Sequence, residues 1–119
     1  MRIGLGLPQI GHEVTANVIK RFSIDSEMAG FDCLWVHERL FTPTNSQWSE
    51  RTAPALSPFE LLSFVAAVTK RIRIGTSVIT IGYHRPVMLA KTSATLDVLS
   101  EGRLNLGIGL GLSKEDYIQ

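Results

Sequence analysis

The sequence predicts an α/β fold in which parallel strands alternate with helices, and three observations support this class. Short apolar runs alternate with longer stretches of helical periodicity four times along the 119 residues. The apolar runs are nearly continuous, as in strands that are covered on both faces of a sheet. The spacing between runs leaves room for a crossover helix, which successive parallel strands require.

The first unit begins with a glycine-rich strand over Arg2–Leu7, which Pro8 ends. A helix is predicted from about Val14 to Met28, because apolar residues recur there at helical spacing. Gly30 occupies the position where a left-handed residue commonly follows a helix. The apolar residues of this predicted helix are Val18, Phe22 and Ala29.

The second unit begins with a continuous apolar strand over Phe31–Val36. The polar connection of residues 37–57 is longer than most loops in a compact domain, so we interpret it as a candidate lid or site wall that carries Trp48. The next helix begins with the segment 57–60 (SPFE), which supplies an N-cap serine, a proline at the first helical position and a glutamate for a capping box. Its expected buried stripe is Leu61, Leu62, Val65 and Val68.

The third strand is predicted over Ile72–Ser77, and the apolar residues 78–81 form its continuation and exit. Pro86 fits the start of the helix that follows. Leu89 and Leu96 lie within this helix, and Gly102 ends it.

The fourth unit begins with a strand over Leu104–Gly107 that runs into the glycine-rich segment GIGLG. Ser113 and the acidic residues after it suit the N-cap and first turn of a fourth helix. Two architectures fit these units: an open doubly wound sheet, or part of a closed (β/α) barrel. A complete barrel takes about 250 residues, so four units are half of one.

Composition and charge exclude several classes of protein. The net charge of +1 provides no field that would attract nucleic acid or anionic lipid. No apolar run approaches the roughly 18 residues that a membrane span needs, and the N-terminal segment does not resemble a signal peptide. Cys33 is the single cysteine, so we expect no intrachain disulfide, a buried thiol and a cytoplasmic setting.

Parallel α/β folds bind ligands at the carboxyl ends of their strands. This rule selects Pro8–Gln9, His37–Arg39, Ser77–Thr80 and Gly107–Leu112. The second segment is the most polar: a histidine there can exchange a proton near neutral pH, and a carboxylate can accept a hydrogen bond from a cofactor ring. The alternative is a local ion pair between Glu38 and Arg39 that shapes the loop. The position of these residues alone favours neither the functional nor the structural interpretation.

Two further motifs point less directly to function. The segment GIGLG is not a dinucleotide-binding fingerprint, because Leu112 replaces its last glycine and it follows the fourth strand instead of the first. We interpret its glycines as letting a flat ring lie close to the backbone. His84 and Arg85 precede a helix start, where a solvated turn is favoured over a site for phosphate or carboxylate.

Three segments carry a resemblance to a known family: GFDCLWVHERL (residues 30–40), the stretch from SPFELL to LGIGLG (residues 57–111) and SKEDY (residues 113–117). They resemble the luciferase-like monooxygenase family, which includes bacterial luciferase, flavin-dependent monooxygenases and deazaflavin-dependent reductases and dehydrogenases. The resemblance implies a parallel (β/α) TIM barrel. Residues 1–119 would then form the N-terminal half of a (β/α)8 barrel domain, a half-barrel of about four βα units.

The resemblance also implies a cofactor, either coenzyme F420 (a deazaflavin) or FMN, with its ring at the carboxyl-terminal mouth of the strands. It implies a cis peptide bond at Ser77–Val78 behind the ring, and an acidic contact from Glu38. The candidate catalytic residues are His37 and Glu38. The candidate cofactor-binding residues are Glu38, Ser77, Val78, Ile79, Gly107 and Gly109.

Two positions depart from the family's sugar-phosphate dehydrogenases. Arg39 stands where those enzymes place a proton-donating histidine, and Leu112 stands where they place a glutamate. These departures argue against that particular chemistry.

The implied activity is hydride transfer or oxygen insertion on a small organic substrate, by a homodimer and without a metal. The alternative is a truncated, non-catalytic half-barrel with at most a dimerisation role. The phosphate-binding elements of barrels come from later strands, so this half is expected to be inactive alone.

Overall fold

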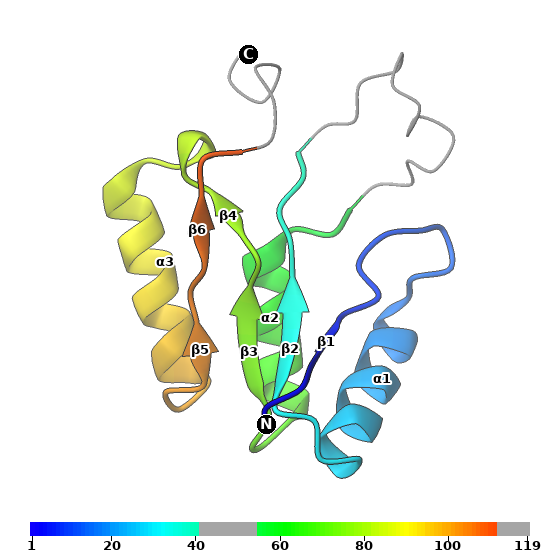
Figure 1. Cartoon of the computed structure of the whole chain (residues 1–119). Coiled ribbons are helices and arrows are strands. Elements are labelled where there is room, and N and C mark those ends of the chain that lie inside the picture. Colours follow the sequence, from blue (N-terminus) through cyan, green and yellow to red (C-terminus); the bar gives the residue numbers. More distant parts are fainter. Residues whose placement is uncertain (41–54, 112–119) are drawn as a thin grey trace.

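The computed structural model describes residues 1–40 and 55–111, which follow the predicted order of strands and helices (Figure 1). Trp48 and the predicted fourth helix from Ser113 lie outside the described residues. The helices are α1 (Ala16–Met28), α2 (Pro58–Val68) and α3 (Pro86–Leu99), with a short 3-10 helix η2 (Ile81–Tyr83) before α3. The strands are β1 (Gly4–Gly6), β2 (Cys33–Val36), β3 (Arg73–Thr76), β4 (Ile79–Thr80), β5 (Leu104–Asn105) and β6 (Ile108–Gly109).

Strands β1, β2, β3 and β5 form one parallel sheet in that order, which confirms the predicted α/β class. Their carboxyl ends therefore meet at one edge of the sheet (Figure 1). The register places Leu5 beside Leu34, Leu34 beside Ile74 and Ile74 beside Leu104, so these side chains form one row on one face. The short strands β4 and β6 follow β3 and β5 along the chain and pair with each other in parallel.

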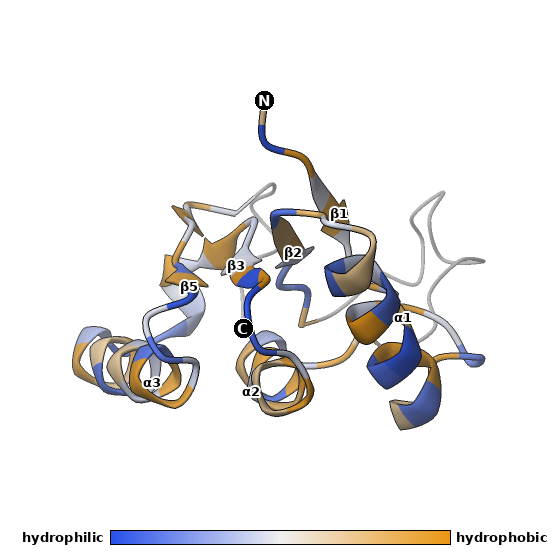
Figure 2. Cartoon of the chain, turned by 90° about the horizontal axis from the view of Figure 1, so that it is seen from below, coloured by the Kyte–Doolittle hydropathy of each residue, from blue (hydrophilic) through white to orange (hydrophobic). Residues whose placement is uncertain are grey.

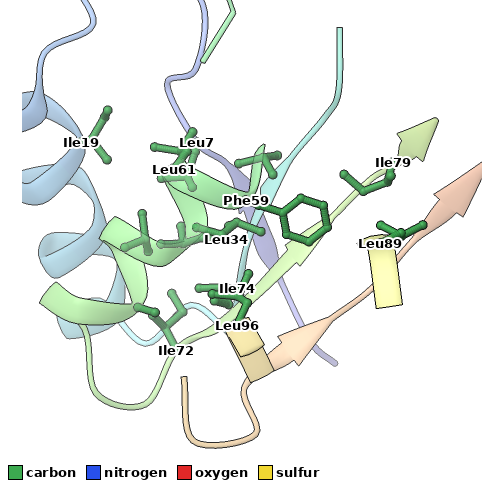
Figure 3. Close-up of a cluster of buried hydrophobic side chains, with 14 residues drawn as sticks. Leu7, Ile19, Leu34, Phe59, Leu61, Ile72, Ile74, Ile79, Leu89 and Leu96 are labelled. Carbon is green, nitrogen blue, oxygen red and sulfur yellow. The ribbon is translucent and has the colours of Figure 1, made fainter. Parts of the chain in front are cut away.

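All three helices lie on the same face of the sheet, as the view from below shows (Figure 2). The hydrophobic core fills the space between the sheet and the helices (Figure 3). Leu34, Leu62 and Ile74 are fully buried in this core. No helix of the described residues covers the other face, which is the arrangement of a barrel wall whose helices lie outside. None of the helices in the two described ranges is long and apolar enough to span a membrane.

Helix α1 lies where it was predicted but buries a different face. Val18 is exposed, whereas Ile19, Ser23 and Ser26 are buried. The Ser23 hydroxyl donates to the Ile19 carbonyl at 2.8 Å, and the Ser26 hydroxyl donates to the Phe22 carbonyl at 2.6 Å. These bonds satisfy both hydroxyls within the helix, so two serines can face the core.

The helix ends follow the predictions with one exception. Gly30 adopts the expected left-handed conformation with φ of 85°, and prolines begin α2 and α3. The capping box of α2 forms differently, because the Ser57 hydroxyl donates to the Glu60 carboxylate and accepts no hydrogen bond from the helix backbone.

Glu27 in the last turn of α1 fastens that helix to the beginning of β3. Its Oε1 accepts hydrogen bonds from the backbone N–H groups of Lys70, Arg71 and Ile72 at 2.9, 2.6 and 2.9 Å. Burial acts to raise the pKa of Glu27, but these hydrogen bonds and the charge of Arg71 outweigh burial and lower the pKa below its ordinary value. The contact fixes where β3 enters the sheet.

The open face of the sheet is flat around Trp35. A Cβ atom at Gly4 or at Gly75 would come within 3.0 Å of the indole ring, so the strands on both sides of Trp35 carry glycine there. Beside this ring, Arg73 donates from Nε and Nη2 to Asn105 Oδ1 at 2.9 and 2.7 Å.

Cys33 is buried, as predicted, and accepts a hydrogen bond from Asn105 Nδ2 at 3.6 Å. Burial raises the pKa of the Cys33 thiol, although the Asn105 hydrogen bond and the Arg73 charge act in the opposite direction. The thiol is therefore a packed side chain and not a reactive one.

Candidate active site

The four segments selected from the sequence lie at the carboxyl-terminal edge of the sheet (Figure 1). They follow β1, β2, β3 and β5, which are neighbours in the sheet. The structure therefore brings together residues that are up to about a hundred positions apart in the chain. We call this edge the mouth and define it by the described residues of those segments.

The segment Ser77–Val78 forms the most exposed part of the mouth after β3. Its peptide bond is cis, as the resemblance implied. The Ser77 N–H donates to the Val36 carbonyl at 2.6 Å, and the Val78 carbonyl accepts the Glu38 N–H at 3.2 Å. Both side chains are exposed, and 39% of Val78 is accessible. An exposed apolar side chain and an exposed hydroxyl thus extend from a backbone that Val36 of β2 and Glu38 hold on the two sides of the peptide bond.

Ile79 belongs to one of the segments that define the mouth, but its side chain is buried beneath Ser77 and Val78. Its exposed fraction is 0%, and its side chain belongs to the core near Phe59 and Leu89 (Figure 3). Its N–H donates to the Gly107 carbonyl at 2.9 Å. Neither its side chain nor its N–H is therefore free for a cofactor, so the cofactor contact predicted for Ile79 becomes an anchoring contact in the structure.

The glycines after β5 have a reason that the sequence interpretation missed. A Cβ atom at Gly107 would come within 3.0 Å of the Thr76 carbonyl oxygen, and one at Gly109 would lie 2.5 Å from Val78 Cγ2. The Thr76 hydroxyl also donates to the Gly107 carbonyl and accepts the Gly107 N–H, both at 2.9 Å. The close approach that requires glycine is made by the neighbouring strand exit of this chain.

Glu38 is turned inward, although it was predicted to contact a cofactor. Only 4% of its side chain is exposed. Its Oε2 accepts the Thr80 N–H at 2.8 Å, and its Oε1 lies 2.8 Å from His84 Nε2. Both carboxylate oxygens therefore bind groups of the same chain, and no ion pair with Arg39 is found in the described part of the molecule.

His84 is part of this cluster, so the interpretation of residues 84 and 85 as a solvated turn is wrong for the histidine. Its side chain is 25% exposed, and its ring meets Phe59 edge to face, with ring centres 6.2 Å apart and planes at 88°. It does bind a carboxylate, but that carboxylate belongs to Glu38, 46 positions earlier in the chain. No sequence signal links two residues at this separation.

His37 is exposed at the mouth, where the sequence predicted a proton-exchanging group. Partial burial, and then the positive charge of Arg39, lower the pKa of His37 below its ordinary value. The imidazole is therefore mainly neutral at pH 7, with one nitrogen able to accept a proton and the other able to donate one.

Gln9 holds the backbone of His37 in place and was identified only by its position after β1. Its buried side chain accepts the His37 N–H at Oε1 (2.9 Å) and donates from Nε2 to the His37 carbonyl. The same Nε2 donates to the Leu56 carbonyl at 3.0 Å. One amide group thus joins three segments behind the mouth.

The mouth can accommodate a flat aromatic group. Gly6, at the end of β1, has no atom within 4 Å of the place where a Cβ would be, so a side chain would fill open space there. Exposed Val78 offers an apolar surface, the Ser77 hydroxyl offers a hydrogen bond, and His37 offers proton exchange. No group of three potential metal ligands is found within residues 1–40 and 55–111.

The comparisons of this chain with known proteins point to one family. The sequence model described as luciferase-like monooxygenase matches residues 7–119. The F420-dependent glucose-6-phosphate dehydrogenase of Kineococcus radiotolerans is 33% identical over 108 residues, which cover 90% of this chain and 31% of that protein.

Two solved structures share the fold. The monooxygenase RslO1 from Streptomyces bottropensis superposes with a TM-score of 0.77 at 26% identity, over 98% of this chain and 35% of that one. The oxygenating constituent of 3,6-diketocamphane monooxygenase from Pseudomonas putida, solved in complex with FMN, superposes with a TM-score of 0.72 at 23% identity, over 98% of this chain and 31% of that one. The chain thus spans about a third of the length of these proteins.

Proposed function

Because the chain belongs to the luciferase-like monooxygenase family, we propose that its mouth holds the ring of a deazaflavin or flavin cofactor in an oxidoreductase that acts on a small organic substrate. The observation that carries this proposal is the exposed Ser77–Val78 segment, whose backbone is hydrogen-bonded to Val36 and Glu38. A rigid, partly apolar surface with few polar groups suits a planar ring.

Residues of this chain would serve the ring in different ways. Val78 would form the apolar surface behind it, the Ser77 hydroxyl would bond to its polar edge, and Gly6 would leave room for it. Gly107 and Gly109 allow the two strand exits to approach each other, which keeps the Val78 surface in place. His37 would exchange a proton with the substrate or the ring.

The bound cofactor would supply the redox chemistry, as hydride transfer with coenzyme F420 or as oxygen activation with reduced FMN. A dehydrogenase relative named as F420-dependent, at 33% identity over 90% of the chain, supports the deazaflavin as the first candidate. The 3,6-diketocamphane monooxygenase structure, solved with FMN, shares the fold at 23% identity. It supports the view that one fold can hold either cofactor.

The alternative is a half-barrel without catalysis that acts at most in dimerisation. In this alternative, a second copy of the chain would cover the open face of the sheet, which carries half-buried Trp35 and Arg73. The alternative predicts a folded chain that binds neither cofactor.

The test is a fluorescence titration of the purified chain with coenzyme F420 and, separately, with FMN. Val78→Asp would place a charge on the proposed ring surface, whereas Val87→Asp places the same charge on α3, where the valine is 79% exposed. We expect V78D to weaken binding at least tenfold and V87D to leave it unchanged. Equal effects of the two variants, or no binding by the folded wild-type chain, would contradict the proposal.

A further inference from the structure

We propose that Glu38 and His84 form a positioning pair: the Glu38 carboxylate holds the mouth in shape through Thr80 and His84 and does not itself contact the cofactor. This inference rests on the proposed function, because it concerns the same mouth. It changes the role of Glu38 from a group beside the ring to a group behind the wall that supports the ring.

The first argument is the place of the carboxylate in the hydrogen-bond ladder. The Ser77 N–H donates to the Val36 carbonyl, and the Glu38 N–H donates to the Val78 carbonyl. In a continued parallel ladder, the Thr80 N–H would donate next to the backbone carbonyl of Glu38. It donates instead to Glu38 Oε2 at 2.8 Å. The Glu38 side chain therefore replaces the backbone carbonyl of Glu38 as the acceptor of the next hydrogen bond after the exposed segment Ser77–Val78.

The second argument is that both carboxylate oxygens are used and the side chain is buried. Oε1 lies 2.8 Å from His84 Nε2, and only 4% of the Glu38 side chain is exposed. A buried carboxylate with two strong partners gains nothing by turning toward a ligand, since it would leave the Thr80 N–H and His84 without their acceptor.

The third argument is that the contacts of the pair join three parts of the chain: the exit of β2, the stretch from β4 to α3, and α2. Glu38 follows β2, and Thr80 of β4 and His84 after η2 both lie in the second part. The His84 ring packs edge to face against Phe59 of α2, which is buried in the core. A change at the pair is therefore transmitted through β4 to the segment Ser77–Val78, which directly precedes that strand.

The hydrogen bonds also determine which ring nitrogen of His84 carries a proton toward Glu38. An ionised carboxylate only accepts hydrogen bonds, so His84 must carry a proton on Nε2. In Glu38→Gln, the amide oxygen can accept the Thr80 N–H while the amide NH2 donates to His84 Nε2. The ring proton would then move to Nδ1, and both hydrogen bonds would survive without the negative charge. In Glu38→Ala both bonds are lost.

The experiment uses 15N-labelled wild-type chain, E38Q, E38A and the control E60Q, which alters the carboxylate at the beginning of α2. Three quantities are measured at pH 7: the tautomer of His84 by long-range 1H–15N spectra, hydrogen exchange at the Thr80 amide relative to the Leu34 amide, and dissociation constants for coenzyme F420 and FMN. We expect E38A to accelerate Thr80 exchange and weaken cofactor binding, each at least about tenfold. We expect E38Q and E60Q to stay within about threefold of wild type, with the tautomer changed in E38Q alone.

Two results would overturn the proposal. Unchanged Thr80 exchange in E38A would show that the carboxylate does not hold β4. A loss of cofactor binding in E38Q as large as in E38A, with Thr80 exchange as in wild type, would show that the charge of Glu38 acts on the cofactor directly. If the wild-type chain binds neither cofactor, the proposed function fails, while the exchange and tautomer measurements still decide whether the pair positions the mouth.

Discussion

Replacing Gly107 with alanine should destabilise the chain by separating the exits of β3 and β5. The new Cβ would lie within 3.0 Å of the Thr76 carbonyl oxygen, whereas carbon–oxygen contacts between strands are about 3.3–3.6 Å. The obstacle is backbone, so no side-chain rotation relieves it, and the two segments must move apart by about 1 Å.

This displacement acts on three hydrogen bonds of Gly107. Two join it to the Thr76 hydroxyl and one joins it to the Ile79 N–H, all at 2.9 Å. Stretching these hydrogen bonds by about 1 Å breaks or greatly weakens them, and each contributes about 1 kcal/mol to the stability. We therefore expect G107A to lower the free energy of unfolding by about 2–3 kcal/mol.

Gly6→Ala is the matched control, because nothing lies within 4 Å of its Cβ position. Both substitutions restrict the unfolded chain equally, so their difference isolates the contact in the folded state. Urea denaturation followed by circular dichroism measures both free energies. A G107A variant within about 0.5 kcal/mol of G6A would refute the reasoning.

Two further predictions concern residues away from the mouth. Glu27→Gln should lower the free energy of unfolding by about 1 kcal/mol at pH 7, because it removes the charge that three backbone N–H groups share, at a partly exposed site. The folded pKa of Glu27 lies below its ordinary value of 4.5. The extra stability of wild type over E27Q should therefore be complete above that value and disappear as the pH falls through the folded pKa. A stability difference that grows toward low pH in urea denaturation would contradict the assignment. Buried Cys33, with its raised pKa, should react with iodoacetamide at least about a hundredfold more slowly in the folded chain than in guanidinium, and mass spectrometry showing equal rates would mean that the thiol is accessible.

Local signals explain how much of the fold could be predicted. Pro58 and Pro86 begin helices because proline suits a first helical position, and Gly30 adopts the left-handed conformation that ends one. The buried face of α1 could not be predicted in this way. Ser23 and Ser26 look polar in the sequence, and only their bonds to carbonyls four residues earlier let them face the core.

The candidate site was predicted in position but not in its contacts. The carboxyl-end rule located Gln9, Glu38, Ser77 and Gly107, because parallel strands bring their ends to one edge whatever their separation in sequence. Which partner each side chain binds depends on contacts between distant segments. Glu38 binds His84 across 46 positions, and Gln9 binds His37 across 28 positions, so neither pair leaves a local pattern.

We propose that the cofactor ring lies at the mouth, next to the ends of β1, β2 and β3. The most direct measurement is the change in amide chemical shifts of the 15N-labelled chain on addition of coenzyme F420 and, in a second series, of FMN. We expect the largest changes at Gly6, His37, Ser77 and Val78, and none at Val87 and Val98 on the exposed surface of α3. Changes confined to α3 would contradict this placement of the ring. So would the absence of any change in a folded chain in the presence of a large excess of either cofactor.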